Sequence, residues 1–325
     1  MRVNFFQRMI VKSRGKEAFK LELLLIVLPA FLIFGTGFIG QKVLKLNIKT
    51  ISTMSLYLMS PFLTFSTFYK NPLNIEYFYM FLFTVFLVIL LIVVTFLVGK
   101  IIKADKTHMS AMLLGSIFPN SGNYGAPVAL FAFGALAFDY AVIIMVFHSF
   151  IINSIGIFIA AFGSEKSTTV KEALQRVVKM PVLYGACLGM LLQVLHIKLP
   201  PTIIDGVSLV GSASIPTVML LLGMQLAEIK PQVFALRYVN TVILIRMIIS
   251  PLLAALLVAF MPVSETIKYV YILLAAMPVA ANTTMLAIQF DVKPNLVSFN
   301  TLVTTLISLL TIPFAIYCLN NFATF

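Results

Sequence analysis

Polar interruptions divide this largely apolar chain into ten segments that are each about long enough to cross a membrane. These segments lie near residues 23–41, 50–69, 77–99, 108–133, 139–162, 180–199, 207–227, 237–261, 267–290 and 295–318. Apolar stretches of about 20 residues span the hydrocarbon core of a bilayer as helices. The longest polar connection, 163–179, leaves five segments on each side. The pattern predicts an all-α integral membrane protein with ten transmembrane helices.

The fourth segment contains a marked interruption. Residues 118–127 include two prolines, two glycines, two asparagines and a serine within otherwise apolar sequence. Proline removes a backbone donor and clashes with the preceding turn, so a continuous helix is not expected here. Within a bilayer, such a break persists only where protein buries it or where it lines a cavity. Broken membrane helices with polar residues at the break are typical of transporter binding sites.

The ninth segment repeats this pattern more weakly, with Pro278 followed by three polar residues at 282–284. Pro127 and Pro278 are 151 residues apart, and Pro61 and Pro216 are 155 apart. With five spans in each half, the second half must enter the membrane in the opposite orientation. The matched prolines predict an inverted-topology repeat, the usual architecture of alternating-access transporters.

The predicted organisation has four parts. They are a basic N-terminal arm (1–22), a first five-helix repeat (23–162), a cytoplasmic central loop (163–179) and a second five-helix repeat (180–320).

Composition supports the membrane class. Hydrophobic residues make up 61% of the chain and charged residues only 10%, with a mean hydropathy of +1.05. Soluble domains carry roughly 25% charged residues, so this deficit indicates an integral membrane protein. The ten segments leave no long polar stretch, so an enzyme domain outside the bilayer is excluded. The net charge of +12 is explained by loop lysines and arginines that face the cytoplasm and anionic lipid, rather than by a nucleic-acid partner.

The loop charges predict the orientation. Thirteen basic residues fall in one set of loops and three in the opposite set, which places the first set in the cytoplasm. The first set comprises Lys42, Lys45, Lys49, Lys100, Lys103, Lys106, Lys166, Lys171, Arg176, Lys179, Lys230, Arg237 and Lys293. Both termini would then lie outside the cell. The basic arm at 1–22 conflicts with that orientation and leaves its own side unresolved.

The two breaks supply most of the candidate binding residues. Pro127 and Pro278 interrupt the backbone hydrogen bonding of their helices. The free N–H groups at an exposed helix N-terminus carry partial positive charge and can bind a carboxylate. Side chains around them add neutral donors and acceptors, and a glycine permits close approach. These candidates are Asn120, Ser121, Asn123, Gly125, Asn282 and Thr283. Alternatively, the breaks are proline kinks whose polar groups bond neighbouring helices.

Two further candidates are basic or titratable. Arg246 is the only basic residue well inside a segment, nine residues from Arg237. It could counter an anionic substrate or fix the carbonyl ends of a broken helix. His148 lies near mid-membrane, where a substrate role competes with ordinary helix packing.

Several kinds of chemistry lack support in the sequence. No Asp or Glu lies deep in a segment, which weighs against proton or sodium coupling through a buried carboxylate. The two cysteines, Cys187 and Cys318, and the three histidines show no metal-ligand spacing. No phosphate-binding glycine loop is present. We therefore expect a non-enzyme without metal or cofactor.

The residues resemble the auxin efflux carrier family, whose members include plant auxin exporters and bacterial permeases for malate and malonate. The resemblance rests on Pro119-Asn120 with Gly125, Pro127 and Gly134, on Arg246 before Ser250-Pro251, and on Ala275-Ala276-Met277-Pro278 with Phe290-Asp291-Val292, Pro294 and Ile312-Pro313. It covers roughly residues 24–320. It implies two inverted five-helix repeats whose fourth and ninth helices cross at their breaks, with Asn120, Pro127 and Pro278 at the crossing. The short central loop lacks the large segment of plant members and favours small carboxylates over auxin.

The sequence thus predicts a multi-pass carrier of the cell membrane that moves small organic anions by alternating access. The alternative is a sodium- or proton-coupled carrier of another solute on the same scaffold. A membrane-embedded enzyme would need a convergent catalytic cluster, and a sensor or structural protein would bind no solute. The expected partners are a small organic anion and the lipid bilayer, and a homodimer is compatible with the sequence.

Overall fold

The computed structural model describes residues 16–166, 168–229 and 236–322. The predicted basic arm at 1–22 lies mostly outside these residues, since the first described helix, α2 (Lys16–Leu44), begins at Lys16. Within the described residues, all the regular secondary structure is helical, apart from one isolated two-residue bridge between extended segments.

Within the described part of the chain, six helical segments are long and apolar enough to cross a membrane. They are α2, α5 (Ile75–Ile101), α8 (Ala135–Phe162), α11 (Pro201–Glu228), the run α12–η3–α13 (Leu236–Ala259) and α16 (Pro294–Phe322). Two consecutive helices, α9 (Val170–Val178) and α10 (Pro181–Val194), bend by 62° and make a seventh candidate if counted as one. The structure is therefore that of an all-helical integral membrane protein.

The remaining predicted spans are helical but interrupted. Segment 50–69 corresponds to α3 (Ile48–Met54), the π-helical turn η1 (Ser55–Met59) and α4 (Ser60–Lys70). Segment 108–133 corresponds to α6 (Lys106–Ile117), the π-helical turn η2 (Ser121–Gly125) and α7 (Ala126–Phe133). Segment 267–290 corresponds to α14 (Glu265–Ala275) and α15 (Asn282–Phe290). The count of ten transmembrane helices stays a prediction.

Proline places the three π-helical turns of the described chain. Each of η1, η2 and η3 (Ile245–Ile249) is followed by a helix whose second residue is proline, namely Pro61, Pro127 or Pro251. Because proline has no backbone N–H, the carbonyl one turn earlier loses its partner and the helix widens locally. The sequence predicted an interruption at 118–127, where the helix stops at 118–120 and is then widened in η2 before Pro127.

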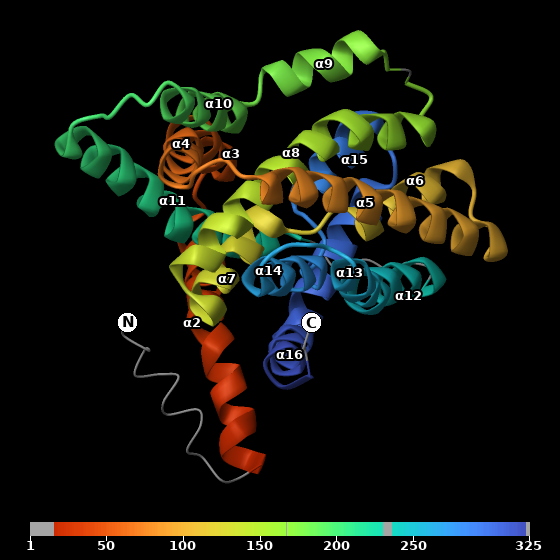
Figure 1. Ribbon diagram of the computed structural model, residues 1–325. Helices are drawn as coiled ribbons and strands as arrows, with labels where there is room; N and C mark the ends of the chain where they lie inside the picture. Colours follow the sequence, from red (N-terminus) through yellow and green to blue (C-terminus); the bar gives the residue numbers. More distant parts are fainter. Residues whose placement is uncertain (1–15, 167, 230–235, 323–325) are drawn as a thin grey trace.

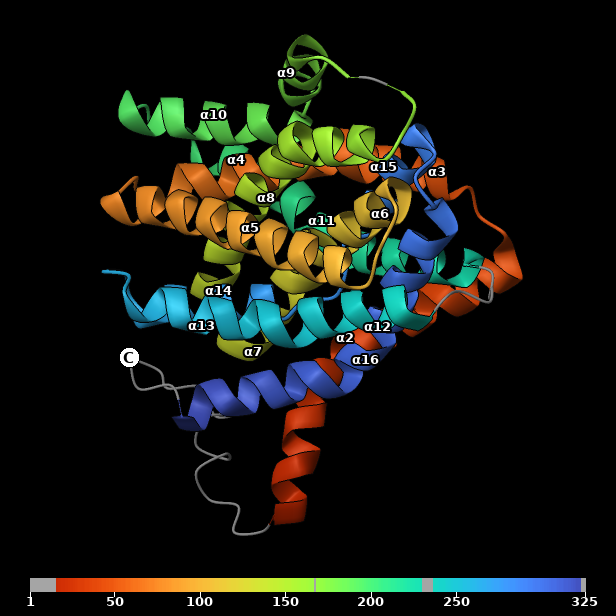
Figure 2. The ribbon, with the colours of Figure 1, turned by 90° about the vertical axis from the view of Figure 1, so that its right-hand side faces the viewer.

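The helices form two groups (Figures 1 and 2). Helices α2, α4, α10 and α11 pack most closely with one another and make the first group. Close approach is possible because glycines face backbone: a Cβ at Gly185 would meet the Pro61 carbonyl oxygen, and one at Gly223 would meet that of Phe34. Small residues at these crossings let the backbones approach, and polar contacts such as Thr64 Oγ1 to the Val182 carbonyl (3.0 Å) add to the packing.

The second group contains α5, α6, α7, α8 and α12 to α16. Its core is formed by large apolar side chains of α5, α6, α8 and α14, among them Leu91, Met112, Ile143 and Leu273. Figure 2 shows α5, α10 and α13 nearly parallel across the view, with α9 seen end-on at the rim of the molecule. This arrangement brings the two interrupted regions, α6–η2–α7 and α14–α15, together within the second group.

Candidate functional site

The two breaks lie side by side and satisfy one another's backbone. Pro119 and Val279 form an isolated antiparallel bridge. The Asn120 N–H donates to the Pro278 carbonyl (2.8 Å), and the Ala280 N–H donates to the Phe118 carbonyl (2.9 Å). The Val279 N–H donates to Thr304 Oγ1 of α16 (3.1 Å). Groups released from two helices are thus paired by a short strand-like crossing, as membrane burial demands.

Arg246 holds the ends of both interrupted helices. It is fully buried on η3, and its Nη1 donates to the Ser116 and Ile117 carbonyls at the end of α6 (3.2 and 3.1 Å). Its Nη2 donates to Ser250 Oγ (2.6 Å) and to the Ala275 carbonyl at the end of α14. Carbonyls at helix C-termini carry partial negative charge and lack intrahelical partners, so a guanidinium stabilises them.

These contacts correspond to the second of the two roles considered for Arg246, the fixing of carbonyl ends. All four N–H groups of its two terminal nitrogens are used by protein acceptors. Only Nε is without a partner among the described residues. The side chain has no exposed surface on which a solute could meet it.

The predicted residues of the first break are mostly sealed within protein. Asn120 and Ser121 are each 4% exposed, and the side-chain amide nitrogen of Asn120 has no partner among the described residues. Gly125 and Pro127 are buried, and Asn123 is half-buried. A Cβ at Gly125 would meet the side chain of Leu274, so this glycine permits the close passage of α14 rather than of a solute. Tyr124 Oη and Ser308 Oγ of α16 lie 2.9 Å apart and complete the seal.

The other predicted residues are scattered. Thr283 is buried and donates to the Ala280 carbonyl (2.7 Å), whereas Asn282 is exposed. His148, on α8, is buried with Nδ1 unpaired within the described part of the chain. Pro278 lies at the crossing.

A cavity of about 540 Å³ opens beside the second break. Its wall comes from both helix groups: α3, η1 and α11 on one side, and α15 and α16 on the other. Polar lining residues are Lys49, Ser52, Thr53, Gln225, Glu228, Thr284, Ser298 and Thr301. Apolar residues such as Leu222 and Met285 form much of the remainder. The cavity is large enough for a small organic molecule.

None of the ten predicted site residues lines this cavity. Ala281 and Thr284, which flank the predicted residues Asn282 and Thr283 in sequence, do line it. Sequence reasoning assigned Lys49 only to a basic loop and placed Ser298 and Thr301 in an ordinary span. A signal for the latter was present, because polar residues recur along α16 at 300, 301, 304, 305 and 308. For Lys49, nothing in the sequence distinguished it from its neighbours Lys42 and Lys45.

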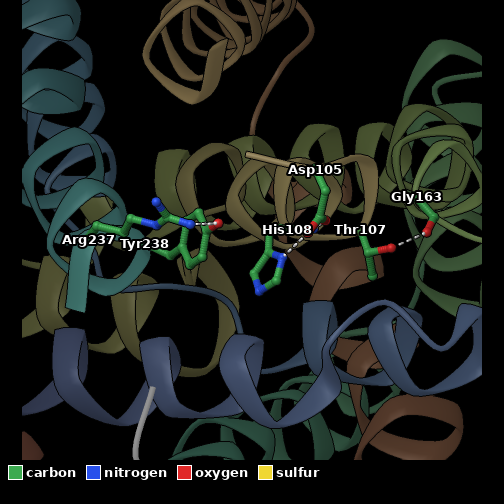
Figure 3. A network of polar contacts seen from close by, with 6 residues as sticks. All are labelled: Asp105, Thr107, His108, Gly163, Arg237 and Tyr238. Carbon is green, nitrogen blue, oxygen red and sulfur yellow. Dashed lines mark hydrogen bonds and ion pairs between the residues drawn. The ribbon is translucent and has the colours of Figure 1, made fainter. Parts of the chain in front are cut away.

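A second polar cluster fixes the N-terminal end of α6 (Figure 3). Asp105 caps the helix through the His108 N–H (2.8 Å), and its second oxygen lies 2.7 Å from His108 Nδ1. The bond from the His108 backbone N–H lowers the pKa of Asp105 below its ordinary value, with further help from the imidazole. The imidazole stacks on Tyr238 at 4.3 Å between centroids, and Arg237 covers the same ring. This stack therefore holds the N-terminal end of α6 against α12. Arg246 of η3, which continues α12, holds the C-terminal end of α6.

Comparison with known proteins decides the family. A family model described as membrane transport protein matches residues 21–316. The chain belongs to this family. The match confirms the auxin efflux carrier-type resemblance indicated by the motifs at the two breaks. An uncharacterized transporter from Methanocaldococcus jannaschii is 26% identical over 272 residues, covering 81% of this chain and 87% of the relative. The protein is a multi-pass membrane transporter of the cell membrane.

Proposed function

We propose that this transporter is a secondary carrier that moves small organic anions by alternating access, and that it is not an enzyme. The observation that carries the proposal is the 540 Å³ cavity between the two helix groups. It runs from Lys49 in the first turn of α3 and Glu228 at the end of α11 to Ala281 and Thr284 at the second break. The loop charges predict that Lys49 lies on the cytoplasmic side. A path from one membrane face to a broken helix near the midplane is what a carrier open to one side requires.

The lining suits a carboxylate on a small apolar body. Lys49 supplies a positive charge, and the hydroxyls of Thr284 and Ser298 supply neutral donors. Ala281 and Thr284 belong to the first turn of α15, where backbone amides give the helix N-terminus partial positive charge. In this proposal Lys49 provides the charge complementarity expected of Arg246, while Arg246 positions the half-helices. The predicted residues Asn120, Ser121, Asn123 and His148 then act behind the cavity wall rather than on its surface.

The helix contacts support an inverted repeat of ten helices. Counting α3–η1–α4 as the second span, the first span packs on the seventh (α2 with α11), and the sixth on the second (α10 with α4). The fourth span packs on the tenth (α6 with α16), and the ninth on the fifth (α14 with α8). Exchanging the two halves maps each pair onto its counterpart, as a two-fold relation between repeats would. Alternating access would then be a movement of one helix group along the other.

Uptake into proteoliposomes tests this function, with radiolabelled malate, malonate and indole-3-acetate offered separately. We expect uptake of at least one carboxylate. Lys49→Gln should raise its KM by up to about fivefold, because partly solvated ion pairs contribute about 0.2–1 kcal/mol. Lys100→Gln removes an exposed charge on the same side but away from the cavity, and should leave KM unchanged. Uptake of a cation or neutral solute without any carboxylate would overturn the anion assignment.

Glu228 favours one alternative, a proton- or sodium-coupled carrier. This carboxylate lines the mouth of the cavity and accepts a hydrogen bond from Gln41 Nε2 (2.8 Å). It could take part in coupling from that position. Glu228→Gln should abolish any dependence of uptake on a proton or sodium gradient if this alternative holds, and should leave such dependence unaltered if it does not.

A further inference from the structure

The central connection contains an amphipathic helix whose apolar face is not covered by the protein. Val170, Leu174 and Val178 of α9 are 66%, 59% and 61% exposed. They recur every fourth residue, so they lie in one stripe along the helix. Fully solvated valine and leucine at three successive turns are costly, which suggests that something apolar covers the stripe.

Contacts with the bundle determine which way the stripe points. Ala173 is 4% exposed and faces the protein. Lys166, just before the helix, donates to the Gln289 carbonyl of α15 (2.7 Å), and the Arg176 guanidinium lies 6.0 Å from the Phe290 ring. Each residue turns a helix by about 100°, so Leu174 points well away from the side that carries Ala173 and Arg176. The stripe therefore faces outward from the rim of the molecule.

The position of α9 matches the membrane interface. Figure 2 shows its axis pointing along the view while α5, α10 and α13 run across it. It connects to α10 through a bend of 62°, and α10 itself exposes Tyr184, Leu188 and Leu191 on its outer face. A helix that lies across the spans, next to a lipid-facing helix, is placed to rest in the plane of the membrane surface.

Charge favours an anionic surface. Residues 164–180 contain four basic residues against two acidic ones. Of these, Lys171 on α9 and Lys179 at its C-cap are both exposed, and Lys171 points away from the side that carries Ala173. The loop charges place this connection in the cytoplasm, where the inner leaflet carries anionic headgroups. We propose that α9 docks on the inner leaflet, with Val170, Leu174 and Val178 in the acyl-chain boundary and Lys171 and Lys179 on anionic phospholipid headgroups.

The absence of tryptophan from the chain permits a direct test. Leu174→Trp and Gln175→Trp each give a protein with one tryptophan, at adjacent exposed positions about 100° apart around α9. Both proteins are reconstituted in nanodiscs of phosphatidylcholine brominated near the top of its acyl chains. Bromine should quench the tryptophan at 174 at least roughly twofold more than the one at 175, because an interfacial helix buries only its apolar face. Leu188→Trp on α10 serves as a positive control for quenching.

The anionic component is tested in the same nanodiscs with phosphatidylglycerol added at a constant share of brominated lipid. Quenching of Leu174→Trp should increase, and Lys171→Gln with Lys179→Gln in that background should remove the increase. These positions are exposed, so the melting temperature should not change. Equal quenching at 174 and 175 would overturn docking of the stripe, and an unchanged signal with phosphatidylglycerol would overturn the anionic assignment.

Discussion

The two breaks look alike in sequence but differ in what surrounds them. The first, between α6 and α7, is sealed at 118–121, where Phe118, Asn120 and Ser121 are at most 4% exposed, and half-buried at Asn123. The second, between α14 and α15, is buried at Val279 but opens onto the cavity at Ala281 and Thr284. The break richer in polar residues is thus the sealed one. The backbone groups of the first break pair with the second break at the crossing. The second break, which has fewer polar residues, supplies the surface that a solute can contact.

The two broken helices, α6 and α14, also differ in what holds their N-termini. Helix α6 begins at Asp105, which caps it through the His108 N–H, and ends on Arg246. Helix α14 also ends on Arg246, but its first flanking residue, Ser264, makes no side-chain cap bond. Instead, the Ser264 backbone N–H donates to Glu76 Oε1 at the start of α5 (2.9 Å). The N-terminus of α6 is thus capped by the residue that precedes it, whereas the N-terminus of α14 is held by another helix.

Replacing Arg246 should have the largest effect, since it would remove the anchor common to both breaks. Arg246→Met would leave three helix-terminal carbonyls without their charged donor. Each hydrogen bond to a charged group contributes about 1.5–3 kcal/mol, so a severe loss of folded protein is expected. Arg246→Lys keeps the charge but cannot reach both helix ends with a planar fork, and should fall in between. Thermal unfolding in detergent measures this. A fully stable Arg246→Met protein would contradict the common anchor.

Gly125 tests the seal of the first break. Gly125→Ala would place a methyl group against Leu274, and its Cβ would lie 3.2 Å from Met277 Cγ. Overpacking of this kind costs typically 1–3 kcal/mol, so the melting temperature should fall by several degrees. Gly206→Ala, where no atom lies within 4 Å of the added methyl, is the matched control and should be neutral or slightly stabilising. If Gly125→Ala is also neutral, the first break has space that the packing does not indicate.

The helix N-termini should show the smallest difference. Asp105→Ala should cost about 1 kcal/mol through loss of the α6 cap, whereas Ser264→Ala removes no cap bond and should cost less. The pKa of Asp105 is lowered in the folded state, so its stabilising contribution is present above its ordinary pKa and is lost as pH falls through the lowered value. Acid unfolding curves of wild type and Asp105→Asn should converge at low pH. Divergence on acidification would contradict the assigned direction.

The sequence predicted the breaks because their signals are local. Proline at 119, 127 and 278 disrupts a helix wherever it occurs, and apolar runs of span length predict membrane helices without knowledge of the fold. It also suggested, among two roles, the fixing of carbonyl ends by Arg246. The choice between those roles depends on burial and on which carbonyls lie within reach, and a single sequence contains neither.

The cavity could not be predicted in the same way. Lys49, Gln225 and Ser298 come from three separate helices, and only the packing of the two groups brings them together. The sequence also favoured the break with more polar residues, although burial determines whether such residues face a solute or one another. Asn282 illustrates this, because it is polar, adjacent to the break and exposed, yet it does not line the cavity.

The most direct test of the difference between the breaks is thiol accessibility from the cytoplasmic side. Cys187 and Cys318 are first replaced by alanine, after which Thr284→Cys and Ser121→Cys are introduced separately. A membrane-impermeant maleimide applied to inside-out vesicles should modify the cysteine at 284 rapidly, and the carboxylate found to be transported should slow that reaction. The cysteine at 121 should react slowly and without protection. Fast, substrate-protected labelling at 121 with none at 284 would contradict a sealed first break and a second break that opens onto the cavity.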